Sequence, residues 1–387
     1  MVQNIIESCQ VNEYPLVSVI VPAYNAQEYI AATLQSLVQQ SYPHLEIIVA
    51  DDGSTDQTVQ IVKNAIKKDN RINLFQQTNC GVAAARNLAI RHSKGNFIAP
   101  VDADDICYPE KIEKLINCFQ NLDNRLGLAY SWSNSIDAYG NLIGRGKKSE
   151  IEGDVFEYLL FQNFIGNASS CLIRKNCFDV IGFYNPSFFL QQAQGCEDYD
   201  IYLRIAAHFQ FKVIKDFLTG YRKTENAMSR NYKCMEKSRQ LVFQDVKLRY
   251  PWIPDIVFKW SLAYYSLWLS SLAAQKGAFH HSLRYLIKAA HNDPLLIKNS
   301  DYLKLICRHI GRGFKEKLTF LQQNKNIYLK KIHHLHTPYT NFSIINLKRK
   351  ALFQSKQSSL SLLKEKRRMR TYFLIRQARI KNDRAIR

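Results

Sequence analysis

Three carboxylates in four residues follow an apolar run, and no other stretch of the sequence points so directly to chemistry. Asp102, Asp104 and Asp105 close the run Phe97 to Val101, which is typical of a buried strand. Burying carboxylates without partners is costly. Mg²⁺ and Mn²⁺ prefer carboxylate oxygens and bridge readily to phosphate. The cluster therefore predicts a divalent cation at the end of the strand, although a solvated turn can have the same composition.

The sequence around this cluster alternates between apolar runs and segments with helical spacing. The predicted strands are Leu16 to Pro22, Leu45 to Ala50, Ile72 to Phe75 and Phe97 to Val101, and the predicted helices are Gln27 to Gln40, Thr58 to Lys68, Val82 to His92 and one entered at Pro109. This order predicts an α/β fold, a doubly wound, mostly parallel sheet with helices on both faces. Ligands of such sheets bind at the carboxyl ends of the strands. Three polar segments lie there: Pro22 to Asn25, Asp51 to Ser54 and Asp102 to Asp105.

The charge of the chain changes sign near Arg230. Of the 53 Lys+Arg and 33 Asp+Glu residues, residues 1–230 hold 21 and 25, which leaves 32 and 8 for residues 231–387. A composition that is 46% hydrophobic and 12% aromatic is typical of globular proteins, and 387 residues suffice for two domains. We therefore predict an α/β domain over residues 1–230, a helical region over 231–348 and a basic tail over 349–387.

The region after residue 230 is expected to be mainly helical. Trp260 to Ala274 and Phe279 to Ala290 have helical spacing, and the first is too short to span a bilayer. Arg349 to Arg387 interleaves Lys and Arg with Leu, Phe and Ile, which predicts a basic amphipathic helix or a partly ordered tail, suited to an anionic membrane surface. The sequence has nine cysteines and no C-x-x-C pair, and Met1 to Pro15 show no signal-peptide pattern. Both features indicate a cytoplasmic protein. If the tail binds the membrane, the protein is peripheral on its cytoplasmic face.

Several motifs match a known family in order and spacing. Their residues are Ser18 to Asn25, Asp51 to Asp56, Gly81 with Ala85 to Asn87, Asp102 to Asp105, Ser169 to Arg174, Gly182 with Phe183, and Gly195 to Asp200. Each motif is weak alone, and their combination is specific. From about Pro15 to Asn231 the chain resembles the family 2 glycosyltransferases of the GT-A fold. The resemblance does not extend to the basic C-terminal region.

The resemblance implies a site for a nucleoside-diphosphate sugar, with a UDP-type donor favoured. The residues expected to bind the donor are Pro22, Ala23, Tyr24, Glu28, Asp51, Asp52, Arg86, Asn87, Asp102, Ala103, Asp104, Arg222 and Arg230. Tyr24 would stack near the base, and Glu28 would meet the ribose or the base edge. Asp51, supported by Asp52, would accept a hydrogen bond from a uracil-type N–H. A capped turn describes Asp51 to Ser54 equally well, and a surface ion pair is the alternative for Arg86.

The resemblance also assigns the metal, as Mn²⁺ or Mg²⁺ bound by Asp102 and Asp104 on the donor diphosphate. Asp105 either belongs to this group or is the N-cap of the helix that Pro109 enters.

One segment departs from the family pattern. Relatives commonly carry Tyr-Arg-x-His, whose histidine helps to hold the metal or the diphosphate, and here Thr224 stands in the histidine position. A hydroxyl is a weak cation ligand. Either the metal is held more loosely, or Arg222 and Arg230 carry the phosphate charge instead.

Catalysis requires a group that takes the proton of the acceptor hydroxyl. The resemblance places this base in a Glu-Asp pair at the start of a helix, and Glu197 and Asp198 precede the helical run Tyr199 to His208. We assign Asp198 as the base and Glu197 as its support or as an acceptor-binding group. The alternative is a pair of acids that only caps the helix.

The sequence thus predicts an inverting glycosyltransferase that moves a sugar to a hydroxyl of a saccharide or lipid-linked acceptor in cell-surface polysaccharide or glycoconjugate synthesis. One alternative is an inactive nucleotide-sugar-binding scaffold, which the intact Asp102, Asp104 and Asp198 disfavour. Another is a basic nucleic-acid-binding protein. The C-terminal region carries no recognised nucleic-acid motif, so nucleic acid is an unfavoured partner.

Overall fold

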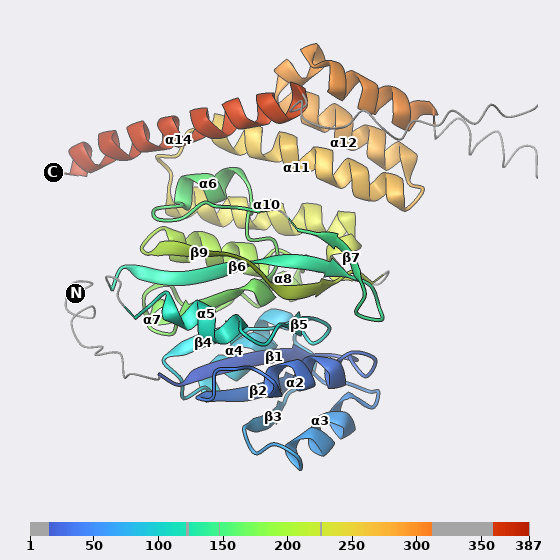
Figure 1. The fold of residues 1–387 in the computed structure, drawn as a ribbon. Helices are drawn as coiled ribbons and strands as arrows, with labels where there is room; N and C mark the ends of the chain where they lie inside the picture. Colours follow the sequence, from blue (N-terminus) through green and yellow to red (C-terminus); the bar gives the residue numbers. More distant parts are fainter. Residues whose placement is uncertain (1–14, 121–123, 147, 225–226, 312–358, 387) are drawn as a thin grey trace, which may run out of the picture. The chain divides into compact units, whose positions relative to one another are not determined.

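The computed structural model describes residues 15–120, 124–146, 148–224, 227–311 and 359–386 (Figure 1). Its contacts divide these residues into two compact units. The first unit runs to Pro254 and also contains the end of the chain from Leu374, and the second runs from Asp255 to Phe373. The division by contacts therefore falls after Pro254, whereas the charge changes sign near Arg230.

Four parallel strands form the first half of the sheet in the first unit. They are β1 (Val17–Ala23), β2 (Leu45–Asp51), β3 (Ile72–Gln76) and β4 (Phe97–Pro100), in the order β3-β2-β1-β4. Figure 1 shows β1, β2 and β3 side by side in shades of blue. Every residue of β1 is buried, as expected for a parallel strand covered on both faces. Ala23 pairs with Asp51, so the polar segments after β1 and β2 begin at the same edge.

The second half of the sheet is mixed. β8 (Cys171–Arg174) runs antiparallel to β4 and β6 (Leu126–Ile136), β9 (Gln210–Arg222) runs parallel to β6, and the short strands β5 (Ile106–Cys107) and β7 (Leu142–Arg145) pair with β9 and β6. The predicted α/β sheet is confirmed. These five strands were not predicted, because their pairing joins distant segments: Tyr130 pairs with both Cys171 and Val213.

Helices connect the strands of the first unit. They are α2 (Ile30–Val38), α3 (Thr58–Ile66), α4 (Val82–His92), α5 (Lys111–Asn117), α6 (Phe156–Phe161), α7 (Cys177–Ile181), α8 (Ser187–Leu190), α9 (Glu197–Ala206) and α10 (Tyr232–Arg249), with short 3₁₀ turns η1 (Ala168–Ser170) and η2 (Met228–Arg230). The bounds of α4 are those predicted. The predicted start of α2 at Gln27 is wrong: the helix begins at Ile30, and residues 27–29 form the turn that precedes it.

The second unit is helical. It contains α11 (Asp255–Gln275), α12 (Phe279–Asn292), the 3₁₀ turn η3 (Pro294–Lys298), a helical segment at 300–311 and the first part of α14 (Ser359–Ile386). The two predicted helices are confirmed with longer bounds. None of the helices that the structure describes combines the length and the apolar character needed to cross a membrane.

The basic tail forms a helix that buries some of its charge. α14 begins at Ser359, and the predicted residues 349–358 lie outside the described residues. Arg367 is 9% exposed and donates to both carboxylate oxygens of the buried Asp293, at 2.9 and 2.6 Å. Its guanidinium carbon lies 4.2 Å from the ring centroid of Trp260. The cations of α14 are therefore not a single free basic surface, because Arg367 belongs to the interior of the second unit.

We expect Arg367→Met to lower the free energy of unfolding of the second unit by about 3–5 kcal/mol, because it leaves a buried carboxylate without its cation. The double variant Arg367→Met/Asp293→Asn removes the orphaned charge and should recover part of this loss. Calorimetric unfolding measures both variants. A single variant as stable as the wild type would contradict this role of the pair.

Candidate active site

Hydrogen bonds join the segments that follow β1 and β2. The Asn25 N–H donates to Ser54 Oγ at 2.9 Å, and Asn25 Oδ1 accepts from the Thr55 N–H at 2.8 Å. Asn25 has a φ of 47°, in the left-handed region that asparagine tolerates. Beside this junction Tyr24 is 51% exposed. The ring that we expect to stack on a base is thus open to solvent on a fixed turn.

The predicted donor-binding residues at these two strand ends comprise two exposed side chains, Tyr24 and Glu28, and four buried residues, Pro22, Ala23, Asp51 and Asp52. Asp51 accepts long hydrogen bonds from the Ser54 N–H at 3.3 Å and from Gln76 Nε2 at 3.4 Å. A carboxylate offers about four acceptor positions. Asp51 therefore keeps capacity to accept a further donor.

Asp52 fixes the start of α4. Its carboxylate accepts from the N–H groups of Cys80 at 2.9 Å and Gly81 at 2.8 Å, and from Gln77 Nε2 at 2.7 Å. Gly81 has a φ of +88°, and a Cβ added there would lie 2.7 Å from the side chain of Phe189, so glycine is required. We expected Asp52 to support Asp51. Its hydrogen bonds instead position the helix that carries Arg86.

Arg86 is 4% exposed, and its Nη2 lies 2.6 Å from Asp102 Oδ1. The alternative of a surface ion pair is therefore wrong. Burial acts to lower the pKa of Arg86, but the charges of Asp102, Tyr184, Glu197 and Asp198 raise it above the usual range. The guanidinium is thus a permanent cation within electrostatic reach of two groups of carboxylates, Asp102 and the Glu197–Asp198 pair.

The three carboxylates after β4 repel one another. Asp102 and Asp104 are half-buried, with Ala103 buried between them, and Asp105 is fully buried. Burial and the charge of Asp102 raise the pKa of Asp104 to about 6, and burial with both neighbours raises the pKa of Asp105. Mg²⁺ and Mn²⁺ are commonly held by one or two carboxylates together with phosphate oxygens. Asp102 and Asp104 fit such an ion, because their oxygens are only partly covered and a cation would relieve the repulsion.

Asp105 is a buried residue whose hydrogen bonds hold the segment of Asp102 and Asp104 in place. Its Oδ1 accepts from the Arg222 N–H at 2.9 Å and its Oδ2 from Ser169 Oγ at 2.5 Å, and Ser169 Oγ in turn accepts from the Asp102 N–H at 2.9 Å. The alternative of a helix N-cap is wrong, since α5 begins only at Lys111. The sequence indicates Ser169 only as a member of a motif, and the structure shows that its hydroxyl joins Asp102 to Asp105.

The Arg222 side chain forms hydrogen bonds with main-chain carbonyl groups. It donates to three carbonyl oxygens, those of Asp104 (2.6 Å), Asp137 (2.8 Å) and Ala138 (2.7 Å). These contacts position the Asp104 segment, so direct contact of Arg222 with phosphate stays a prediction. Arg230 is half-buried, and its Nη1 lies 3.5 Å from the carbonyl oxygen of Thr224. Its role towards phosphate also stays a prediction.

Glu197 and Asp198 begin α9. Glu197 Oε2 accepts from the Gly195 N–H at 2.8 Å, and Asp198 Oδ1 accepts from the Tyr199 N–H at 2.7 Å, so the pair satisfies N–H groups at the helix start. Burial raises the pKa of Glu197 to about 7 and that of Asp198 to about 6. Glu197 is 3% exposed and Asp198 half-buried. A general base is most effective with a pKa near the working pH, and of the two Asp198 is the more accessible.

We expect part of the stability of the ligand-free protein to be lost as the pH rises, because of Glu197. Its pKa in the fold, about 7, lies above its ordinary value of 4.5. The contribution of Glu197 to the free energy of unfolding is therefore fully present below its ordinary pKa. That contribution is lost as the pH rises through the pKa that Glu197 has in the folded protein. Glu197→Gln should flatten this part of the pH dependence. Denaturant unfolding from about pH 5 to about pH 8 measures the effect; equal slopes in variant and wild type would contradict it.

Tyr184 joins the site and was not predicted as a site residue. The Arg86 guanidinium carbon lies 5.3 Å from the centroid of its ring. Asn87 Nδ2 donates to the Tyr184 carbonyl at 2.8 Å and Asn87 Oδ1 accepts from the Tyr184 N–H at 2.9 Å, so Asn87 positions Tyr184 and its amide is not free for the donor. Within the described residues, three buried polar atoms at this place have no hydrogen-bond partner: Arg86 Nε, Tyr184 Oη and Glu197 Oε1. A polar ligand or water would satisfy them.

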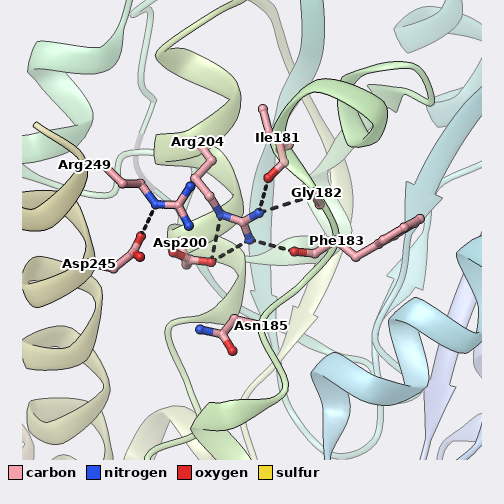
Figure 2. Close-up of a pocket in the computed structure, with 8 residues that line it drawn as sticks. All are labelled: Ile181, Gly182, Phe183, Asn185, Asp200, Arg204, Asp245 and Arg249. Atoms are coloured by element: carbon pink, nitrogen blue, oxygen red, sulfur yellow. Dashed lines mark hydrogen bonds and ion pairs between the residues drawn. The ribbon is translucent and has the colours of Figure 1, made fainter.

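Arg204 braces the segment that leads to Tyr184. Figure 2 shows its guanidinium between Asp200, at 2.7 Å, and the carbonyl oxygens of Ile181 at 2.8 Å and Phe183 at 2.9 Å. These groups line a cleft of about 280 Å³. Its charged side chains pair with one another, Asp200 with Arg204 and Asp245 with Arg249, and none of the predicted donor-binding residues lines it. The cleft is therefore lined by the groups that hold the segment before Tyr184 in place, and it is not the donor site.

The fold is of the GT-A type, a fold found in glycosyltransferases. The solved mannosyltransferase PcManGT from Pyrobaculum calidifontis, in complex with GDP-Man and Mn²⁺, aligns with 82% of this chain and 92% of its own, at 18% identity and a TM-score of 0.51. This likeness shows the fold.

The chain belongs to glycosyl transferase family 2, whose family model matches residues 18–177. Over 203 residues it is 34% identical to an uncharacterized glycosyltransferase of Haemophilus influenzae, which covers 50% of this chain and 78% of that protein. It is also 29% identical over 209 residues to the chondroitin synthase of Escherichia coli and 27% identical over 207 residues to the hyaluronan synthase of Pasteurella multocida. The matches cover 54% of this chain but only 29% and 20% of the two synthases.

Proposed function

We propose that this glycosyltransferase takes its sugar from a nucleoside-diphosphate donor and transfers it, with inversion, to a hydroxyl of a saccharide or lipid-linked acceptor. The observation that carries this proposal is the position of Arg86. One buried guanidinium pairs with Asp102 at 2.6 Å and interacts with the charges of Glu197 and Asp198. A donor held at Asp102 and an acceptor proton taken by Asp198 would therefore belong to one site.

The donor would lie across the ends of β1, β2 and β4. Tyr24 offers an exposed ring to a base, and Asp51 keeps acceptor capacity for a ring N–H, which favours a uracil-type base. The diphosphate would reach Asp102 and Asp104 through Mn²⁺ or Mg²⁺, and the bound ion would neutralise the charge that develops on the leaving diphosphate.

Asp198 and Glu197 would act on the acceptor. Asp198 removes the proton from the acceptor hydroxyl as the oxygen attacks the anomeric carbon, and the bond to the diphosphate oxygen breaks with its electron pair. Attack opposite the leaving group inverts the configuration at that carbon. Glu197 lies buried beside Asp198, and its raised pKa of about 7 leaves it partly protonated near neutral pH, which reduces the negative charge beside the base.

The acceptor and the pathway are proposed from the relatives that the chain matches. The names of the chondroitin and hyaluronan synthases suggest polysaccharide synthesis, but the chain matches less than a third of either. We propose a saccharide or a lipid-linked saccharide of the cell surface as the acceptor. An anionic membrane on the cytoplasmic side is the proposed partner for the cations of α14 that remain exposed, such as Lys366, Arg370 and Lys381.

A thermal-shift screen of nucleoside diphosphates and their sugars, with and without Mn²⁺, tests the donor proposal. A ligand that binds only the folded protein raises the melting temperature in proportion to ln(1 + [L]/Kd). We expect a uridine diphosphate sugar with Mn²⁺ to give the largest shift. The same screen with Asp104→Asn should lose the dependence on Mn²⁺. No shift with any diphosphate would contradict the proposal.

A further inference from the structure

The hairpin between β6 and β7 exposes large apolar side chains. Tyr139 is 91% exposed, and Leu142 and Ile143 are 59% and 57% exposed. All three lie within five residues at the tip of one hairpin. A Cβ added at Gly140 or at Gly144 would meet nothing within 4 Å, so the tip projects into open space. Clustered apolar exposure of this kind marks an interaction surface more often than single exposed residues do.

The hairpin is held in one conformation by Asp137. Its Oδ1 accepts from the N–H groups of Tyr139 and Asn141, both at 2.9 Å, and its Oδ2 accepts from Asn141 Nδ2 at 3.1 Å. The Asp137 N–H donates to the Asn141 carbonyl at 2.9 Å. The apolar tip is therefore pre-organised, and little conformational entropy is lost when it binds.

Positive charge flanks the apolar tip. From Ala138 to Ser149 the sequence contains Arg145, Lys147 and Lys148 and no acidic residue. Arg145 and Lys148 are exposed, and both lie over the ring of Phe217, at 5.6 and 5.8 Å from its centroid. These contacts hold the two cations at the base of the hairpin, where they would meet negative charge while the tip meets an apolar phase.

The base of the hairpin is joined to the active site through Arg222. The Arg222 side chain donates to the carbonyl oxygens of Asp137 and Ala138 in the hairpin and of Asp104 in the metal-binding segment. One guanidinium thus fixes the hairpin relative to the end of β4. A surface bound by the hairpin would lie next to the mouth of the site.

We propose that Tyr139, Leu142 and Ile143, at the tip of the β6–β7 hairpin, insert shallowly into an anionic lipid surface, with Arg145 and Lys148 at the headgroups. Leu142 and Ile143 have no group that could hydrogen-bond a saccharide, whereas an aromatic and two aliphatic side chains beside cations suit the boundary between acyl chains and anionic headgroups. This contact is separate from α14 and does not require any step of the proposed reaction.

Sedimentation of the full chain with phosphatidylglycerol vesicles, and with phosphatidylcholine vesicles, tests the proposal. We expect Tyr139→Ser/Leu142→Ser/Ile143→Ser to weaken binding to phosphatidylglycerol vesicles by about tenfold or more, since burying one large aliphatic side chain alone can favour transfer by that factor. Arg145→Gln/Lys148→Gln should weaken binding at low salt and leave little difference at high salt.

The matched control is Leu190→Ser/Leu248→Ser, which removes two leucines that are 81% and 82% exposed elsewhere on the first unit. We expect it to bind vesicles as the wild type does, and all variants to keep the wild-type melting temperature. Equal binding by the hairpin variant and the wild type would overturn the proposal, as would an equal loss in the leucine control or no binding by the wild type. Donor-induced thermal shifts do not depend on lipid, so failure here would be distinguishable from failure of the proposed function.

Discussion

Replacing Asp198 with Asn is expected to lower the rate of sugar transfer by about 10²–10⁴-fold, the usual contribution of a general base. Burial raises the pKa of Asp198 to about 6, so the carboxylate is mostly ionised at neutral pH and can accept a proton. Donor affinity should stay close to that of the wild type, because the base acts on the acceptor and not on the diphosphate. Steady-state kinetics and donor titration measure the two effects separately.

Asp179→Asn provides the matched control for this experiment. Asp179 is an exposed aspartate in α7, and the same substitution there should change neither the rate nor the affinity. Loss of donor binding in Asp198→Asn with a normal fold would move Asp198 to the donor site. Wild-type turnover in that variant would remove it from the reaction.

Asp104→Asn should abolish most activity without destabilising the protein. Asp104 lies in a carboxylate cluster where burial and Asp102 raise its pKa to about 6, so an uncharged amide relieves repulsion in the ligand-free fold. We expect a melting temperature equal to or above that of the wild type. Turnover should fall by about 10²-fold or more, because the proposed cation would lose one of its two protein ligands.

Measuring turnover and unfolding together separates this result from a general loss of structure. The Asp179→Asn variant again serves as the control. Wild-type turnover by Asp104→Asn in the presence of EDTA would show that the metal assignment is wrong. A fall in melting temperature would show that the carboxylate stabilises the fold, which the repulsion argument excludes.

The parallel half of the sheet could be predicted from the sequence because its strands are mainly apolar runs, each followed by a helix. The bounds of α4 were predicted correctly, since Gly81 marks its start and His92 its end. α2 starts at Ile30 after a turn at residues 27–29, and the side chains of Thr58 and Asp56 accept hydrogen bonds from N–H groups of the segment before it. Such side-chain contacts across the fold leave no periodicity in the sequence, and neither does the pairing of β6 with both β8 and β9.

The candidate site, like the fold, could be predicted only in part from the sequence. The motifs brought Arg86, Asp102 and Asp198 to attention, and the structure places the first two in direct contact. Sequence spacing did not indicate that Asn87 holds the main chain of Tyr184 or that Asp52 holds the start of α4. Both side chains contact main-chain atoms of segments that are distant in the sequence, and the sequence does not show which distant segment such a side chain meets.

The C-terminal region illustrates the limit of charge counting. The sequence predicts a basic amphipathic tail over residues 349–387, but Arg367 is buried against Asp293 in the second unit. Deleting residues 349–387 would therefore remove a buried ion pair along with the exposed cations. Substitution of the exposed residues Lys366, Arg370 and Lys381 is the cleaner test of membrane binding by α14.

The stereochemistry of donor cleavage tests the proposed reaction most directly. Proton NMR can follow the anomer of free sugar that the wild type first releases from an α-linked nucleoside-diphosphate sugar when water replaces the acceptor. A single displacement with Asp198 as the base predicts that the β-anomer appears first, before mutarotation, and that Asp198→Asn forms it far more slowly. Initial release of the α-anomer would contradict inversion at this site, and no release from any nucleoside-diphosphate sugar with Mn²⁺ would contradict the proposed donor.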